Sequence, residues 1–331
     1  MQIAGSTTTL AGSGEHTDYG PFTVQGRIEN GAPTAELVFA RPVTGLENVR
    51  LAIAPTQDGF SIDTEGGSAL GPFAGTLGLY SPQGGPTRID IESLTVSNTS
   101  VSGGLTLVDG GAQGALALAG GGLDGTIALT PRDGGQGIDL DLAARNASFG
   151  GSTPLSIGRA DIAATGVIGG GSYNFSGTAN AQGLQYGTLF IGRMAAQGEV
   201  VDGVGRVDAA ISGRRGNRFA LDLNAQFQPN RIALVADGQF AGRKITMPRR
   251  AVLTALDGGG WQLAPTQVNY ADGGAIASGT FGTDQTTLEV KLARLPLSLV
   301  DIVGSDLGLG GTISGIVDYR TVRGGLPTGT A

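Results

Sequence analysis

Residues 109–142 have the sequence DGGAQGALALAGGGLDGTIALTPRDGGQGIDLDL, and this stretch decides the fold. Apolar residues alternate with polar or small ones, most clearly in GIDLDL at 137–142. Glycine clusters at 109–111, 120–122 and 133–135 separate the alternating segments. A period of two predicts strands with one apolar and one polar face, and glycines that accept positive φ predict tight turns between them.

The same pattern continues along the chain, for example at 22–28, 88–92, 219–223, 231–235 and 287–292. Many short strands between turn signals predict an all-β protein. Glycine supplies 60 of the 331 residues, and glycines within or beside strands favour strong curvature. The pattern alone leaves two architectures open, a closed sandwich and an open curved sheet. Because the composition is uniform, we expect residues 1–331 to form one elongated segment.

One short helix is expected at about 296–303, between strands. Pro296 suits a first helical turn, and Gly304 suits a C-terminal stop. The apolar side of this helix would hold Leu297, Leu299, Ile302 and Val303.

The composition excludes several kinds of site. Without cysteine there is no thiol nucleophile, Cys-type zinc site or disulfide, and His16 as the single histidine excludes a multi-histidine metal centre within one chain. We therefore expect no catalytic residues, no bound metal and no cofactor. The net charge of -7 argues against nucleic acid as a partner. Neither a signal peptide nor an apolar run long enough for a transmembrane helix is evident.

Two basic clusters interrupt this acidic chain, at 214–218 and 243–250. The simplest interpretation is that they are solvated turns, with contact to anionic lipid headgroups as the lesser alternative. Asp139 and Asp141, two residues apart on one strand, are most simply explained as a solvated face rather than an acid–base pair.

A family resemblance is carried by LPLSLVD at 295–301, LGLGGTISG at 307–315 and GGLP at 324–327. The order of these motifs resembles the recurrent signature of the TamB family of Gram-negative bacteria, a Leu-Pro-Leu helix followed by a glycine-spaced strand and a Gly/Pro turn. Supporting segments are ALGPF at 69–73, GLDGTI at 122–127 and GWQLAP at 260–265.

The resemblance implies a fold and a function. The fold would be an elongated, curved, many-stranded sheet that forms an open half-pipe, a β-taco-like groove with an apolar interior. The function would be a periplasmic conduit for phospholipids between the inner and outer membranes, in support of outer-membrane biogenesis and protein assembly. Full-length members are anchored in the inner membrane and engage the outer-membrane barrel TamA. Because the anchor and the TamA-binding domain are not recognisable here, we expect an internal segment that does not itself contact TamA.

A lipid conduit needs no catalytic group, only an apolar lining. About 12 kcal/mol opposes the transfer of a chain of roughly fifteen methylenes into water, and aliphatic side chains would remove most of that cost. The helix at 296–303 would gate the mouth of the groove. The expected lining is formed by the apolar residues that occupy every second position of the strands. These residues are Leu116, Leu118, Ile127, Leu129, Ile138, Leu140, Leu142, Phe219, Leu221, Leu223, Ile232, Leu234, Leu288, Val290 and Leu292.

Two other interpretations stay open. The same apolar residues would form an ordinary core in a closed sheet. As a function of another class, the chain would be a secreted or surface adhesin or an autotransporter passenger. Such a passenger is expected to be a closed right-handed β-helix with a dry interior that binds no lipid.

Overall fold

The computed structural model describes residues 7–16, 19–29, 32–42, 45–132, 135–169, 174–282, 284–302, 310–322 and 326–330. These residues form an all-β structure in which consecutive strands pair antiparallel, as the alternation predicts. Contacts divide the chain into two compact units, Met1–Gly170 with Gln185–Gly187, and Gly171–Leu184 with Thr188–Ala331. That the whole chain forms one functional segment stays a prediction.

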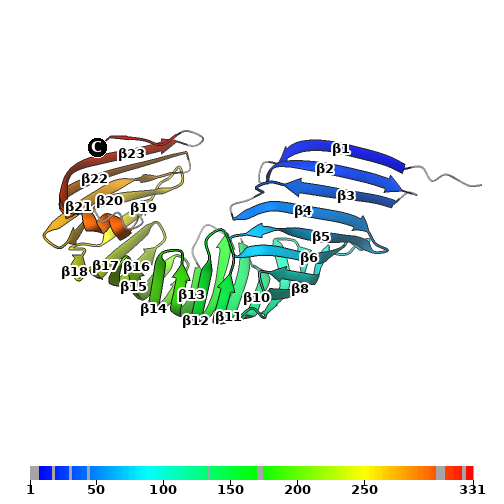
Figure 1. Ribbon diagram of the computed structural model, residues 1–331, viewed down its shortest axis with the longest axis horizontal. Helices are drawn as coiled ribbons and strands as arrows, with labels where there is room; N and C mark the ends of the chain where they lie inside the picture. The colour runs from blue at the N-terminus through cyan, green and yellow to red at the C-terminus, as the bar shows by residue number, and fades with distance from the viewer. Residues whose placement is uncertain are drawn as a thin grey trace, which may run out of the picture. The chain divides into compact units, whose positions relative to one another are not determined.

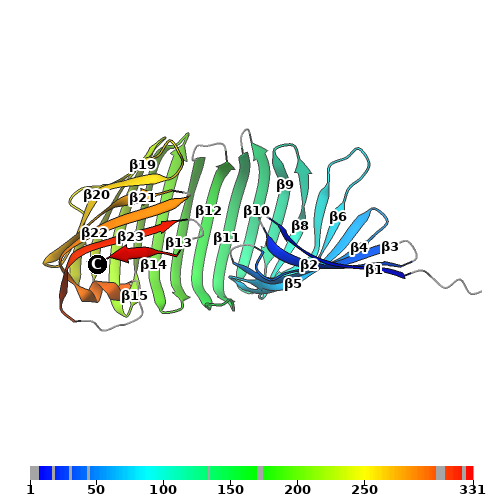
Figure 2. The same ribbon diagram turned by 90° about the horizontal axis from the view of Figure 1, so that it is seen from above.

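The first unit is a series of antiparallel strands, each paired with the next along the chain (Figure 1). The direction of the strands turns steadily from β1 to β11 when the unit is seen from above (Figure 2). The strands are β1 (Thr7–His16), β2 (Gly20–Glu29), β3 (Ala32–Phe39), β4 (Leu46–Pro55), β5 (Gly59–Ser68), β6 (Gly71–Tyr80), β7 (Arg88–Val96), β8 (Thr99–Val108), β9 (Gly111–Ala119), β10 (Leu123–Arg132), β11 (Gly135–Phe149) and β12 (Leu155–Gly169).

The second unit continues the same construction with one local exception. Strand β17 pairs with both of the short strands β18 and β19, and these in turn pair with β20. The strands are β13 (Asn174–Tyr186), β14 (Leu189–Val201), β15 (Val204–Arg215), β16 (Asn217–Gln228), β17 (Arg231–Phe240), β18 (Arg243–Thr246), β19 (Ala251–Ala255), β20 (Trp261–Tyr270), β21 (Gly273–Phe281), β22 (Gln285–Pro296), β23 (Thr312–Val322) and β24 (Thr328–Thr330).

Glycine is needed inside the strands as well as in the turns. Gly125 in β10 has a φ of 147°, a value that side chains disfavour, and a methyl group there would overlap the carbonyl oxygen of Asp141 on β11. The two backbones therefore approach more closely at this point than any larger residue allows. Register shifts between β6 and β7 and between β20 and β21 bend the sheet further.

A compact hydrophobic core is found in the second unit. Phe240 and Tyr270 have 0% of their surface exposed and are joined by Ile245 and Leu295. The hydroxyl of Tyr270 donates a hydrogen bond of 3.2 Å to the carbonyl oxygen of Phe240. Elsewhere the strands bury few side chains fully. Most apolar side chains of the described strands are therefore half-buried rather than fully buried.

The expected helix is corrected by the structure. Residues Leu297–Ile302 form a six-residue 3-10 helix, η1, and Pro296 is the last residue of β22 rather than part of a first helical turn. The nitrogen of Leu297 instead donates a hydrogen bond to the carbonyl oxygen of Gly311. With three residues per turn, η1 does not have the 3.6-residue spacing on which the amphipathic prediction was based. No helix among the described residues is long and apolar enough to span a membrane.

Candidate functional site

Strand register shows which residues share a face. Residues directly opposite one another on neighbouring antiparallel strands point to the same side of the sheet, and we call a row of such residues a rung. The rung through Leu116 crosses β4 to β12 in the first unit. Its members are Ile53, Ile62, Leu77, Ile91, Gly103, Leu116, Ile127, Leu140 and Ala164.

The two rungs beside it have the same character. One passes from Leu118 through Gly125 and Leu142 to Ile162, and the other from Gly114 through Leu129 and Ile138 to Gly166. All seven residues predicted to line a groove in β9, β10 and β11 therefore lie on one face, the apolar face of the first unit. Their side chains are half-buried.

The second unit has an apolar face of its own. Phe219 lies opposite Phe240, and Leu221 is joined through Gly238 and Ile245 to Tyr270. A longer rung passes from Phe227 through Ile232, Leu253, Leu263, Gly279 and Leu288 to Tyr319. Leu223 lies an even number of positions from Phe219 in β16, and Leu234 from Ile232 in β17, so each pair shares a face. Val290 and Leu292 share a face with Leu288 in β22 for the same reason. The structure thus places all eight residues predicted for this part of the chain on one face.

Single glycines interrupt the bulky residues along these rungs. Gly114 lies between Leu105 and Leu129, and Gly125 lies between Leu118 and Leu142. Each glycine leaves space into which its large neighbours extend. The apolar face is thus covered by leucine and isoleucine side chains even where a rung contains glycine.

The opposite face of each sheet is polar. Asp139 and Asp141 are exposed there, beside Thr165 and Thr126 respectively, as is Asp222. Lys291 and Glu289 form an ion pair of 3.0 Å. The structure thus places Asp139 and Asp141, the two residues expected on a solvated face, on the polar face.

Ion pairs form both within and between the strands of the polar face. Arg145 and Arg159 both bond Asp161, at 2.6 and 3.1 Å. The hydrogen bond from Arg145, and then that from Arg159, lowers the pKa of Asp161 below its ordinary value. Because these groups are solvent-exposed, each ion pair adds little to the stability of the fold. Burial of the apolar rungs is expected to supply most of it.

The predicted gate is only partly described. Leu297 and Leu299 are half-buried, and Leu299 packs against the core around Phe240. Ile302 is the last residue of η1, and Val303 lies outside the described residues. The contact of Leu299 makes η1 part of the packed core, while its gating role stays a prediction.

Several residues of the apolar face escaped the sequence analysis. They include Ile62, Leu77 and Ile91 in the first unit and Met194 and Ile211 in the second. The alternation at 88–92 contained the signal for Ile91. In β7 a bulge changes the parity between Ile91 and Leu94, so the face of Leu94 follows from the register and not from sequence spacing.

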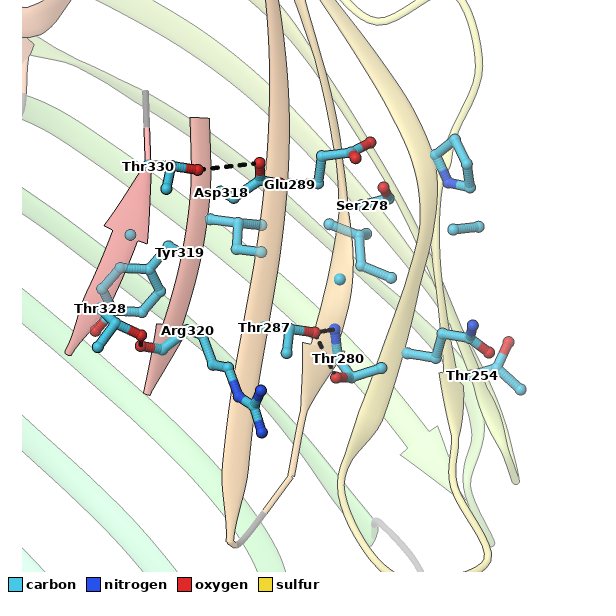
Figure 3. A pocket seen from close by; sticks show the side chains of 17 residues that line it. Thr254, Ser278, Thr280, Thr287, Glu289, Asp318, Tyr319, Arg320, Thr328 and Thr330 are labelled. Carbon is cyan, nitrogen blue, oxygen red and sulfur yellow. Dashed lines mark hydrogen bonds between the residues drawn. The ribbon is translucent and has the colours of Figure 1, made fainter. Parts of the chain in front are cut away.

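A hydroxyl-rich hollow of about 840 Å³ lies on the polar face of β19 to β24 (Figure 3). The hydroxyls of Thr280 and Thr287 are 2.8 Å apart, and Thr330 donates a bond of 3.4 Å to Asp318. The chain's single histidine, His16, lies in β1 of the other unit, so this hollow contains no histidine base to activate a hydroxyl.

The apolar faces are thus the principal candidate site. No group of three potential metal ligands is found among the described residues. What the arrangement provides is half-buried aliphatic surface that an apolar ligand would cover. Comparison with known proteins gave no match to a family model, to a curated protein or to a solved structure.

Proposed function

We propose that the chain is a lipid-transfer conduit of the TamB type, acting in the periplasm as an internal segment of an inner-membrane-anchored protein. In this proposal each sheet forms an open half-pipe whose apolar face carries the acyl chains of phospholipids. The segment would support outer-membrane biogenesis, and TamA would be engaged by another part of the full-length protein.

The observation that carries the proposal is the continuity of the apolar rungs. The rung through Leu116 consists only of isoleucine, leucine, glycine and alanine over nine strands. Eight strand spacings of about 4.8 Å give a path of roughly 40 Å within the first unit alone. An ordinary core needs no such path, whereas movement of a lipid requires one.

The chemistry of the rungs also suits movement rather than fixed binding. Burial of an acyl chain gains about 0.8 kcal/mol per methylene group wherever the chain lies on aliphatic surface. The rung through Leu116 offers similar aliphatic contacts on successive strands and no charged group. A lipid would therefore find similar affinity at each step.

The alternative of a β-helical adhesin has less support. A β-helix of this type is built from parallel strands. The strand pairs that the structure describes are antiparallel. Adhesion through the polar face stays a hypothesis without an observation that favours it.

The test is lipid extraction and mass spectrometry on the chain after export to a bacterial periplasm and detergent-free purification. Phospholipid is expected to co-purify and to decrease in Leu140→Asp. Leu221→Asp is less suitable, because Leu221 packs against the core around Phe240 and its loss would perturb folding. A folded wild-type chain that is free of lipid and transfers no labelled phospholipid between vesicles would contradict the proposal.

A further inference from the structure

Basic residues from separate parts of the sequence meet at one edge of the second unit. Arg214 near the end of β15 lies directly opposite Arg218 near the start of β16. The backbone nitrogen of Ala241, in the turn before β18, donates a bond of 2.9 Å to the carbonyl oxygen of Arg218. The fold thereby brings the cluster at 214–218 beside the one that begins at 243.

The adjacent rung of the polar face adds two further cations. It runs from Arg193 through Ser212, Ala220 and Gln239 to Lys244. The side chains of Arg193, Arg214, Arg218 and Lys244 are all exposed. We call these four residues the basic patch.

The basic patch differs from those cations of the polar face that are paired with carboxylates. Arg50 is paired with Glu36 and Glu65, and Arg145 with Asp161, within 4 Å. Within the described part of the chain, no ion pair of this kind is found for any of the four patch residues. Two arginines directly opposite each other repel, so their arrangement costs stability unless an anion lies between them.

Acidic residues do lie on neighbouring elements. Asp222 and Asp237 face each other one rung further toward the middle of the strands, and Asp272 is in the turn after β20. These carboxylates limit the positive field to the edge of the sheet. An anion would therefore be attracted to the outer end of β15, β16 and β18.

The patch has a rigid support and a defined hollow. The guanidinium of Arg214 lies 5.2 Å from the ring centroid of Phe190, which orients it. A hollow of about 600 Å³ is lined by Phe190, Ser212, Arg214, Arg218 and Gln239. Behind it, on the other side of the sheet, Phe219 packs against the buried core that contains Phe240.

We propose that the basic patch docks the second unit onto the phosphate headgroups of an anionic phospholipid bilayer. Arginine and lysine side chains bind phosphate oxygens strongly, and exposed tips at the ends of several strands can meet a surface together. Among the described residues, Phe190 is the one ring that an arginine of the patch stacks on, and the chain has a net charge of -7; neither suits nucleic acid, which favours basic domains with several stacking rings. This inference goes beyond the conduit, because it concerns the polar face and the place where the unit attaches.

The test is co-sedimentation of the whole chain with vesicles of phosphatidylcholine, with and without an equal part of phosphatidylglycerol. Each basic residue at an anionic surface strengthens binding by roughly fivefold, so Arg214→Gln with Arg218→Gln is expected to weaken it roughly 25-fold. The matched control is Arg27→Gln with Arg206→Gln, which removes the same charge at exposed positions outside the patch. Binding by the control is expected to stay within about fivefold of the wild type.

Several outcomes would overturn the proposal. These are equal binding to vesicles without phosphatidylglycerol, equal weakening by the control pair, and complete displacement from vesicles by duplex DNA at equal phosphate concentration. Circular dichroism would verify that both double variants are folded. Co-purified phospholipid should be unchanged in the Arg214 and Arg218 variant, which separates failure of docking from failure of the conduit.

Discussion

Leu116→Asp places a carboxylate in the middle of the longest apolar rung. Leu116 lies between Gly103 and Ile127, and its side chain is half-buried. The next residue, Ala117, points to the polar face between Ser102 and Thr126 and is exposed. Leu116→Asp and Ala117→Asp therefore add the same charge to the same strand on opposite faces.

The expected loss of stability follows from the burial. A fully buried leucine contributes about 1.5–3 kcal/mol, so a half-buried one contributes roughly half of that. Because an open face leaves the new carboxylate in contact with water, we expect Leu116→Asp to cost about 1–2 kcal/mol in total. In a closed core the cost would exceed about 4 kcal/mol, since the charge would be buried without a partner.

Binding of lipid should respond far more strongly. An acyl chain laid across residue 116 would have to desolvate the carboxylate, at a cost of a few kcal/mol. We expect at least tenfold less phospholipid per protein in Leu116→Asp, and wild-type occupancy in Ala117→Asp. Urea unfolding measures the stability of all three proteins, and mass spectrometry of extracts measures the lipid.

Two results would refute this reasoning. If Leu116→Asp unfolds the first unit, the apolar face is covered as in a core. If the variant is folded and carries as much lipid as Ala117→Asp, the lipid does not lie on the apolar face.

Three further predictions concern the fold. Gly125→Ala should destabilise the chain by at least about 2 kcal/mol in urea unfolding. The φ of 147° at this position is strained for alanine, and the added methyl group would overlap the carbonyl of Asp141. A stability equal to that of the wild type would contradict the close approach of β10 and β11. Phe240→Ala should cost about 3–5 kcal/mol, since a fully buried ring is lost from the core of the second unit. Arg145 lowers the pKa of Asp161 in the folded state. The ionised carboxylate of Asp161 therefore stabilises the fold above the unfolded pKa of about 4, and this stabilisation is lost as the pH falls through the folded pKa. Acid titration should therefore bring the stabilities of wild type and Asp161→Asn together, and a difference that persists at low pH would argue against this pair.

Much of the fold could be predicted from the sequence because local rules decide it. The alternation in GIDLDL at 137–142 shows which side chains of β11 share a face, and the register keeps Leu140 beside Ile127 as that parity requires. The turn glycines at 120–122 lie between β9 and β10 as expected.

The remainder depends on contacts between distant residues. The bulge between β6 and β7 places Leu94 on the same face as Ile91, although the two residues have opposite parity in the sequence, and the local pattern gives no signal of it. Likewise, the pairing of β17 with β18 and β19 brings Phe240 and Tyr270 together across 30 residues, and only the folded sheet shows it. β22 extends through Pro296, and a 3-10 helix follows it. The pairing of β22 thus outweighs the local preference of Pro296 for a first helical turn.

A lipid path on the apolar face can be tested directly by site-specific photo-crosslinking at two adjacent positions of β11. A photoreactive side chain at residue 140 would lie on the apolar face, and one at residue 141 on the polar face. After expression in a bacterial periplasm and irradiation, we expect covalent phospholipid adducts at position 140 and none at position 141. Equal adducts at both positions, or none at position 140 in a folded chain, would contradict a lipid path on the apolar face.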